Sequence, residues 1–549
     1  MNDTNSLVIV FQDYLERALD VIEPAFRKQI EFSIEVVLDD NPALLEKNLS
    51  YGSHTTIKND RIKVVLYPFK ESYLIHGVLA REAFNSLLPT TIKDLNPARD
   101  LGWEFARLNL TAKDRVLWTK LWKECTEVIS VDSMRYEAPF DFPLFSEVTK
   151  GEFLKDILQN FQASKYLAIR FTTKDYVRIF LEYYQEYTYK FDAEELRIIN
   201  FLRENPTASA RDIARVFGVP YSKIYRKLSM LRRLQILTQR KKLSYSKLGM
   251  ITTLVWINSI KPTDFAYKKL LQDPFLFSVF SYLDCKGGAV FAYAFPKHKD
   301  NIAHFKDEIR KLQKRTKCED CFIRHFQPSK AYISQSFSML LPDQGQWVFN
   351  TESWKIWVLQ YFESDVTKLA IGTDIEVVDL KNVPLYKFSE LDMKVIKEIY
   401  NRNFSVRAIA SRLKKSPNNI EESLKKLKQL GVVTDMVRVH YLGLSSIIFL
   451  YMQVPDNLVL PVIIALKEFP YAISYVKAEK DINEILSFIR ISPQIENKVM
   501  KALYDVLSPR VPHFEMHIGR FVYWGSYKVP FELWDYKNHS WKPFFTKKE

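Results

Sequence analysis

The chain has 549 residues, 47% of them hydrophobic and 14% aromatic, which is the composition of a globular protein. One hydrophobic core rarely serves a chain of this length, so roughly three to five domains are expected. The net charge of +14 favours a polyanionic partner, most simply nucleic acid, although a generally basic proteome would give the same value. Four cysteines are too few for a disulfide framework, no apolar run has the length of a membrane span, and the first residues lack a signal-peptide pattern. We therefore expect a cytoplasmic protein with no membrane partner.

Residues 1–188 predict an α+β domain whose role the pattern does not define. Strand-like alternation and amphipathic helical periodicity both occur in this region. The expected strands cover residues 32–38 and 61–67, and the expected helices cover residues 13–30, 72–88, 103–129 and 151–161.

The strand and apolar helix of this region distantly resemble zinc metallopeptidase-like domains. The active helix of those domains carries His-Glu-x-x-His, because two His one turn apart bind one metal. The matching segment here is Arg81-Glu82-Ala83-Phe84-Asn85, in which only Glu82 fits and Arg81 cannot bind zinc in practice. The resemblance would imply a degenerate enzyme. The alternative is an ordinary buried helix with Arg81 and Glu82 at its solvated edge.

Other patterns that carry catalysis are weak. Cys318, Cys321 and His325, with Cys285 upstream, suggest zinc, but structural sites usually need two well-spaced ligand pairs, and buried or surface thiols are the alternative. The sequence has no P-loop, no Gly-x-Gly-x-x-Gly and no Gly-x-Ser-x-Gly. We expect no enzyme activity, no catalytic residue, no cofactor and no metal.

The stretch from Phe191 to Tyr245 is the most informative part of the chain. Three short helical patterns are followed by a basic segment, Ile236 to Tyr245, which predicts a short hairpin of the kind called a wing. From Ile213 to Thr263 the sequence has no Asp or Glu but eleven Lys and Arg. An acid-free run of this length favours contact with phosphate. The alternatives are a solvated charged helix and a winged helix that contacts only other proteins.

The third helical pattern, residues 221–234, has an apolar face of Ile224, Leu228, Leu231 and Leu234. A third helix of this kind enters the major groove, where its first turns reach base edges and flanking cations neutralise phosphates. The residues expected to bind DNA lie outward on this helix or in the wing, and they are Tyr221, Ser222, Lys223, Tyr225, Arg226, Lys227, Arg233, Arg240, Lys241 and Lys242.

The following residues, 249–328, show strand and helix patterns in the order β-α-β-β-α-β, the split order of a ferredoxin-like sheet. The whole pattern returns from Phe388 onward. The apolar residues Ile213, Ile224, Leu228, Leu231 and Leu234 recur 196 positions later as Ile409, Ile420, Leu424, Leu427 and Leu430. A constant offset over these core positions predicts a duplicated module.

Each copy also ends in two Trp seven positions apart. The pairs are Trp347 with Trp354 and Trp534 with Trp541, each with Ser before the second Trp. The tails are therefore predicted to correspond in this register.

The copies differ on the outward face of the third helix. Glu421 and Glu422 stand where the first copy has Tyr225 and Arg226. Phosphate repels such acids, but Glu also reads cytosine, so DNA contact by the second copy stays open.

A helix-turn-helix with a wing, joined to β-α-β-β-α-β, resembles the Lrp/AsnC family of prokaryotic transcription regulators. In the first copy the resemblance is carried by Leu196, Ile198, Ile199, Ala210, Ile213, Ala214, Lys227, Leu228, Leu231, Ile236 and Leu237. In the second copy it is carried by Ile409, Ala410, Leu424, Leu427, Leu430, Gly431, Val432 and Val433. It covers about residues 191–326 and 388–520.

The resemblance implies a sequence-specific, archaeal-style transcription regulator that binds double-stranded DNA through Ser222, Lys223, Arg226 and Lys227. Family members usually have one copy and form dimers or larger rings, so a homo-oligomer and an intramolecular pseudo-dimer are both open. A small-molecule effector is also open, because the loops at 286–288 and 479–481 match the family's Gly-x-Asp pattern only in part.

The expected fold class is α+β and multidomain: two winged helix-turn-helix domains, each followed by a ferredoxin-like βαββαβ domain, with an α+β N-terminal domain. A scaffold that uses winged helices for protein contacts is the alternative function. The expected domains are 1–188 (N-terminal), 189–248 and 387–443 (winged helix-turn-helix), 249–328 and 444–521 (ferredoxin-like), 329–386 (aromatic connector) and 522–549 (tail).

Overall fold

The computed structural model is a multidomain α+β protein that divides into two compact units. The first unit contains residues 1–130 and 138–184, and the second contains residues 131–137 and 185–549. The structure describes residues 4–22, 33–38, 53–58, 61–66, 72–87, 96–125, 142–153, 156, 183–258, 265–282, 287–315, 322–363, 375–381, 383, 386–401, 405–479, 482–524 and 529–544.

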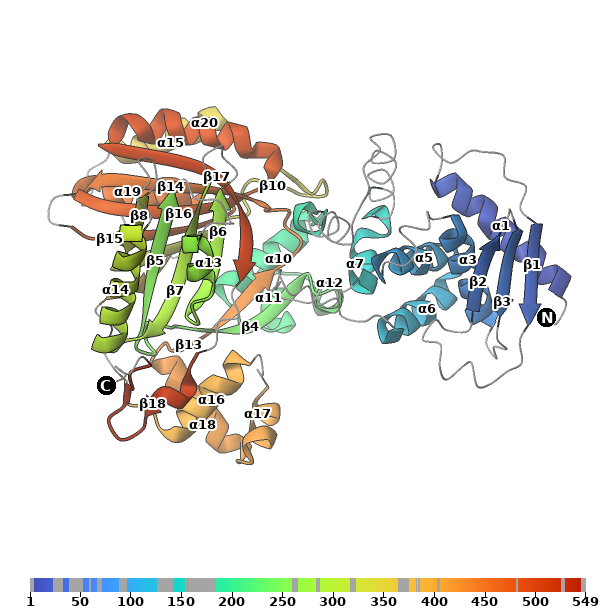
Figure 1. Cartoon of the computed structure of the whole chain (residues 1–549), viewed down its shortest axis with the longest axis horizontal. Coiled ribbons are helices and arrows are strands. Elements are labelled where there is room, and N and C mark those ends of the chain that lie inside the picture. Colours follow the sequence, from blue (N-terminus) through green and yellow to red (C-terminus); the bar gives the residue numbers. More distant parts are fainter. Residues whose placement is uncertain are drawn as a thin grey trace. The chain divides into compact units, whose positions relative to one another are not determined.

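The first unit combines a small sheet with helices (Figure 1). Strand β3 lies in the middle of the sheet, parallel to β1 and antiparallel to β2. The expected helix at 13–30 begins earlier, at Thr4, and the expected 103–129 helix is two helices; most of the one expected at 151–161 lies outside the described residues. The elements are α1 (Thr4–Ile22), β1 (Ser33–Leu38), β2 (Ser53–Lys58), β3 (Arg61–Leu66), α3 (Ser72–Leu87), α5 (Asn96–Asn109), α6 (Ala112–Cys125) and α7 (Phe142–Thr149).

The charged pair of α3 lies inside this unit, so the predicted solvated edge is wrong. Arg81 is 4% exposed and its guanidinium bonds Glu82 Oε1 at 2.8 Å. The guanidinium also lies 5.0 Å from the ring of Trp103 on α5. A buried charge is tolerated only when it is paired, and apolar periodicity alone does not reveal that both faces of a helix are covered.

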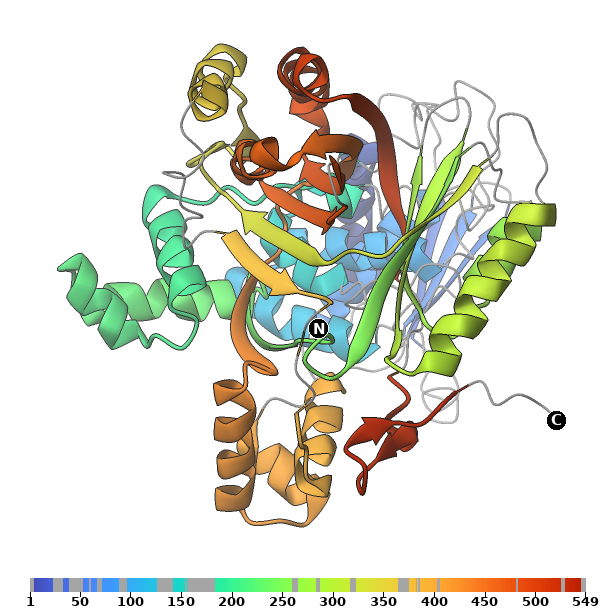
Figure 2. The same cartoon turned by 90° about the vertical axis from the view of Figure 1, so that its left-hand side faces the viewer.

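The second unit is built on one ten-stranded sheet (Figures 1 and 2). Its strand order is β12-β9-β15-β16-β14-β17-β6-β7-β5-β8. The strands of this sheet are β5 (Met250–Asn258), β6 (Leu276–Tyr282), β7 (Gly288–Pro296), β8 (Phe322–Phe326), β9 (Lys330–Gln335), β12 (Ile375–Asp379), β14 (Ser446–Pro455), β15 (Tyr471–Lys477), β16 (Ile482–Ile491) and β17 (His513–Trp524). The helices that follow its strands are α13 (Phe265–Leu271), α14 (Lys299–Arg315), α15 (Thr351–Glu363), α19 (Asp456–Lys467) and α20 (Glu496–Leu507).

The sheet consists of two halves with the same internal order. In the first half β8, β5, β7 and β6 are neighbours, and in the second half β17, β14, β16 and β15 are neighbours in the same sense. The last strand of each half continues onto the edge of the other half. Residues 519–524 of β17 pair with β6, and β9, which follows β8, pairs with β15. The two copies therefore exchange edge strands.

This exchange curls the sheet around one interior. Strands β8 and β9 are far apart in the strand order, but only residues 327–329 separate them in the chain. Residues of both halves form one apolar cluster between the strands, in which Trp256 of β5 contacts Phe449 and Tyr451 of β14. On the other face of the first half, α13 and α14 cover the strands. The two copies thus share a core.

Two three-helix modules complete this unit. The first has α10 (Ala193–Glu204), α11 (Ala210–Phe217) and α12 (Tyr221–Arg233), and the second has α16 (Glu390–Tyr400), α17 (Val406–Leu413) and α18 (Pro417–Gln429). Side-chain oxygens accept from free backbone N–H groups at four helix starts, at Asp192, Ser209, Ser389 and Ser416. Ser405 stands at the cap position of α17 without such a bond.

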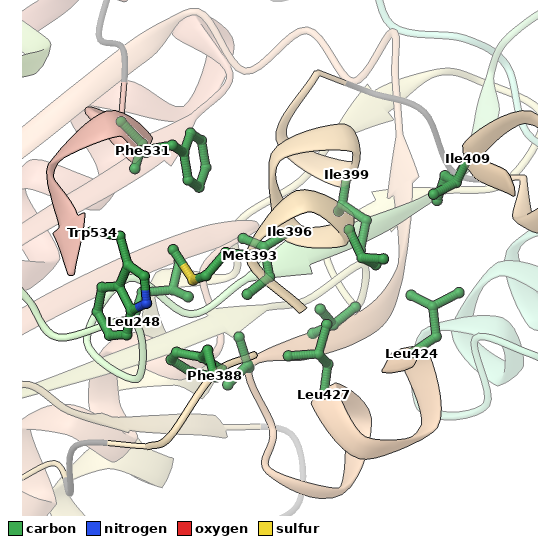
Figure 3. Close-up of a cluster of buried hydrophobic side chains, with 14 of the residues drawn as sticks. Leu248, Phe388, Met393, Ile396, Ile399, Ile409, Leu424, Leu427, Phe531 and Trp534 are labelled. Carbon is green, nitrogen blue, oxygen red and sulfur yellow. The ribbon is translucent and has the colours of Figure 1, made fainter. Parts of the chain in front are cut away.

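The repeated apolar spacing forms the cores of these modules. Ile213, Ile224 and Leu231 are fully buried in the first, as are Ile409, Ile420 and Leu427 in the second. Figure 3 shows the second core, where Phe531 and Trp534 of the C-terminal segment lie beside Leu248, Met393 and Ile396. The core of the second module therefore includes residues of the first copy and of the C-terminal segment.

Each copy also ends in a short hairpin, but not in the predicted register. The first is β10 (Leu340–Leu341) with β11 (Gln346–Trp347), and the second is β18 (Trp534–Asp535) with β19 (Ser540–Trp541). Strand pairing aligns Trp347 with Trp541, whereas the spacing of the Trp pairs predicts that Trp347 corresponds to Trp534. The indole N–H groups of Trp347 and Trp541 donate to Leu442 O and Leu248 O respectively, both at 2.7 Å. These acceptors lie in the linkers that join each three-helix module to the sheet, residues 244–249 in the first copy and 440–445 in the second. Each hairpin thus contacts the linker of the opposite copy.

Candidate nucleic-acid interface

Helix α12 is the element that would enter DNA. Ile224, Leu228 and Leu231 fix one of its faces in the core of the first module. Gly218 ends α11 in the left-handed conformation with φ 65°, which allows the chain to turn sharply before α12. The opposite face of α12 is therefore held outward by the packing of its buried face.

The outward face of the first turns carries two aromatic rings. Tyr221 and Tyr225 are 46% and 55% exposed, and their ring centroids are 5.7 Å apart. The Arg211 guanidinium of α11 lies 5.8 Å from the Tyr221 ring. Ser222 and Arg226 are also exposed. This face offers a cation, hydroxyls and flat rings.

Two of the predicted DNA-binding lysines bind acids of the same module. Lys223 Nζ lies 2.8 Å from Glu194, and Lys227 forms an ion pair with Asp192 at the start of α10. Partial burial acts to lower the pKa of Lys227, but the hydrogen bond and charge of Asp192 outweigh it, so this pKa is raised. The arrangement gives Lys227 a structural task, because it ties α12 to α10.

The predicted wing hairpin is wrong. Residues 236–245 contain one strand, β4 (Leu237–Leu243), which pairs antiparallel with β13 (Val433–Val439) of the second copy. Backbone bonds at both ends of the ladder are reciprocal, from His440 N to Ile236 O and from Ser244 N to Val432 O, both at 2.9 Å. The sequence pattern of a strand does not specify its pairing partner. Here the partner is the equivalent strand of the second copy and not a neighbouring strand joined by a local turn.

The basic residues of β4 consequently lie on a ladder between the copies. Lys241 Nζ binds Asp435 at 2.8 Å, and Lys242 Nζ binds Glu376 at 2.7 Å. Arg240 is half-buried beside them. Arg233 lies exposed in the last turn of α12. The structure therefore brings Tyr221, Ser222, Tyr225 and Arg226 together and places the β4 cations elsewhere.

Sequence reasoning missed Arg211. This residue lies exposed on α11, and its only signal was an outward position in the second helix next to a turn. Arg215 is exposed one turn further along the same helix. Because α11 packs against α12, these cations extend the basic surface beyond the third helix.

The first turns of the third helix carry acids in the second module. Glu421 and Glu422 are exposed on α18 at the positions of Tyr225 and Arg226. Lys426 of the same helix binds the buried Asp392 at 2.5 Å, and Lys428 binds Asp435 at 2.5 Å. The first turns of α18 thus present acids, and two of its later lysines are held by acids.

Among the described residues, no three His, Cys, Asp or Glu side chains converge as metal ligands. Cys285, Cys318 and Cys321 lie outside the described residues, and His325 bonds Thr253 Oγ1 at 2.7 Å. Within the part of the chain that the structure describes, no helix is long and apolar enough to cross a membrane.

Comparisons with known proteins give weak and partial resemblances. No protein-family model and no curated protein matches the chain. Among solved structures, the siroheme decarboxylase NirDL is 14% identical with a TM-score of 0.32, over 60% of this chain and 92% of that one. The same enzyme in complex with an iron-uroporphyrin III analogue gives 12% and 0.31, over 58% and 87%. An AsnC-family transcriptional regulatory protein from Pyrococcus furiosus gives 16% and 0.19, over 24% of this chain and 88% of that one.

Proposed function

We propose that this chain is a cytoplasmic transcription regulator that binds double-stranded DNA in a sequence-specific manner through α12. The observation that carries the proposal is the outward face of α12, where Tyr225 and Arg226 are exposed and are joined by Tyr221 and Arg211. Arg contacts phosphate and guanine, and an aromatic ring contacts the thymine methyl group. The proposal assigns the chain no catalytic role.

The proposed architecture is a tandem Lrp/AsnC-type regulator. Each half is interpreted as a helix-turn-helix followed by a ferredoxin-like domain, and the strand pair β4–β13 takes the place of the wing. The shared interior and the exchanged edge strands support an intramolecular pseudo-dimer over a homo-oligomer. Light scattering of the purified protein would give the mass of a single chain under this proposal and a multiple of that mass otherwise.

Fluorescence anisotropy with a labelled random duplex, at two salt concentrations, tests DNA binding. We expect the affinity to fall steeply with salt, because bound phosphates release counterions. Arg226→Ala should lower the affinity about tenfold and reduce the salt slope by about one. Arg310→Ala, which removes an exposed Arg from α14, is the matched control and should have no effect. Binding that is absent, or equal at both salt concentrations, would contradict the proposal.

A scaffold for protein contacts is the second candidate, favoured by the exposed apolar side chains of the same surface. Val216 on α11 is 62% exposed, in addition to the two tyrosines of α12. A scaffold would keep its partner when Arg226 is changed to Ala and lose it when Tyr225 is changed to Ala. A DNA-binding face should be weakened by both changes.

A further inference from the structure

The interior shared by the two halves contains polar atoms that an apolar core does not need. Trp256 of β5 is 0% exposed, and its register partner across the ladder is Arg324 of β8. The indole Nε1 and the guanidinium Nη1 of this pair are both buried, and neither has a hydrogen-bond partner among the described residues. Buried donors are nearly always satisfied in native proteins, by protein, water or a ligand. Two neighbouring unsatisfied donors therefore indicate a missing acceptor.

Arg324 is surrounded by rings from both copies. Its guanidinium carbon lies 5.3 Å from the Trp256 ring and 5.4 Å from the Phe322 ring, both of the first half. It lies 4.5 Å from the ring of Tyr451, on β14 of the second half. Aromatic faces stabilise a guanidinium, but they accept none of its in-plane N–H groups. The rings therefore fix the position of Arg324 without supplying an acceptor for its buried Nη1.

The acid of this region is already engaged. Glu484 Oε1 accepts from Tyr451 Oη at 2.8 Å, and Glu484 Oε2 lies 2.9 Å from Lys477 Nζ. Burial acts to raise the pKa of Glu484, but these bonds outweigh it, so the pKa is lowered and the carboxylate is ionised at neutral pH. No ion pair in the described ranges includes Arg324. Within the described part of the chain, its charge therefore lacks a direct carboxylate partner.

We propose that Trp256 and Arg324 bind the carboxylate of a small aromatic acid in the interior between the two copies. A carboxylate accepts from a guanidinium and a neighbouring N–H at once, and the rings of Phe322, Tyr451 and Trp256 suit a flat apolar body. Asn258, two residues along β5 and on the same face, has a buried Oδ1 to which no side chain or backbone group that the structure describes donates. A hydroxyl on the acid would supply that donor, so the ligand class is a hydroxylated aromatic acid. This site goes beyond the proposed DNA binding and does not depend on it.

Fluorine NMR of the whole chain labelled with 5-fluorotryptophan tests the site. The sequence has ten Trp, and Trp256→Phe identifies the resonance of Trp256. Titration with 4-hydroxybenzoate should shift this resonance saturably, whereas the neutral 4-hydroxybenzyl alcohol should not. A Trp256 resonance that stays fixed at the highest soluble concentration of 4-hydroxybenzoate would overturn the proposal and leave water as the acceptor.

Variants assign the binding energy to Arg324. Arg324→Gln should weaken the binding of 4-hydroxybenzoate at least tenfold, and Arg315→Gln, which removes a cation at the end of α14 near Phe265, should leave it unchanged. Equal affinity in Arg324→Gln and the unmodified chain would refute the role of Arg324. If Arg324→Gln fails to fold, the titration of the unmodified chain still decides. Failure of the DNA experiment leaves this titration unaffected, so the two proposals fail separately.

Discussion

The two helical modules share their buried residues and differ on their exposed ones. The apolar spacing around Ile213 and Ile224 is repeated at Ile409 and Ile420, and all four side chains are fully buried. On the outward face, Arg226 of α12 is replaced by Glu422 of α18, and both are exposed. Packing therefore constrained the same positions twice, while the surfaces diverged. The two outward faces therefore differ in charge at the first turns of the third helix, although the second module also exposes Arg407 and Lys425.

The modules also hold their third helices differently. Lys227 reaches Asp192, whose side chain is 37% exposed. In the second module Lys426 reaches Asp392, which is 2% exposed and also accepts from Ser423 Oγ at 2.7 Å. The acid of this connection is thus partly solvated in the first module and buried in the second, whereas the lysine is 17% exposed in the first and 44% exposed in the second.

The largest expected effect comes from removing these acids. Asp392→Ala should destabilise the second module by about 2–4 kcal/mol, because the buried Ser423 hydroxyl and the Ser389 N–H lose their acceptor and the half-exposed Lys426 loses its ion pair. Asp192→Ala should cost the first module about 1–2 kcal/mol, the value of a helix cap and a solvated ion pair. Hydrogen exchange of the amides of α10–α12 and α16–α18 measures both.

Asp300→Ala, an exposed acid in the first turn of α14, is the control and should change neither module. Equal losses from Asp192→Ala and Asp392→Ala would contradict the difference in burial.

The sequence was sufficient for features that depend on local pattern. The spacing of Leu228 and Leu231 predicted the buried face of α12, and the constant offset predicted its repeat in α18. The β-α-β-β-α-β order was also read directly, since each element has its own period.

Features that depend on long-range partners could not be predicted. Strand β4 pairs with β13, almost two hundred residues later, and the pattern of β4 is the same for a local hairpin. The burial of Arg81 depends on Trp103 of another helix. The set of candidate DNA-binding residues became smaller for the same reason. Lys227 and Lys241 form ion pairs with Asp192 and Asp435, and these pairs exist only in the folded chain.

The charge difference between the modules leads to a prediction of gained binding. Changing Glu421 to Tyr and Glu422 to Arg copies the face of α12 onto α18 and removes two acids. We expect the affinity for random duplex to rise about tenfold or more, since two repulsive charges are lost and one phosphate contact is added. Fluorescence anisotropy at low salt measures the gain.

Glu352→Arg on α15, which replaces an acid with a base outside both modules and makes most of the same change in net charge, is the control. If it raised the affinity as much as the double change, net charge would explain the gain and α18 would have no specific part in it.

The two linkers differ in one titratable residue, since His440 of the second copy stands where the first copy has Ser244. We therefore expect the second linker to make the stability of the protein depend on pH. Burial, followed by the charges of Arg438 and Arg240, lowers the pKa of His440 to about 3, so the ring is neutral in the folded state. The unfolded chain takes up a proton below about pH 6.5, and stability therefore falls as the pH decreases from about 6.5 towards 3. His440→Ser should remove about 1–2 kcal/mol of this loss at pH 5.

Thermal unfolding at pH 7.5 and pH 5 measures this effect as the difference between the two proteins. His325, whose pKa burial lowers to about 4, contributes equally to both and cancels. An unchanged acid sensitivity in His440→Ser would mean that His440 is protonated in the folded chain.

The smallest expected effect tests the symmetry of the two hairpins. Trp347 and Trp541 each donate one bond of 2.7 Å to the linker of the opposite copy. Trp347→Phe and Trp541→Phe should each cost about 1 kcal/mol for that bond, beyond the loss of ring volume. Trp354→Phe gives the cost of volume alone, because its buried indole N–H has no acceptor among the described residues. Urea unfolding measures the three variants. If Trp347→Phe and Trp541→Phe cost no more than Trp354→Phe, these two indole bonds do not stabilise the contact between the copies, and the exchanged strands, the β4–β13 ladder and the shared core join the two halves.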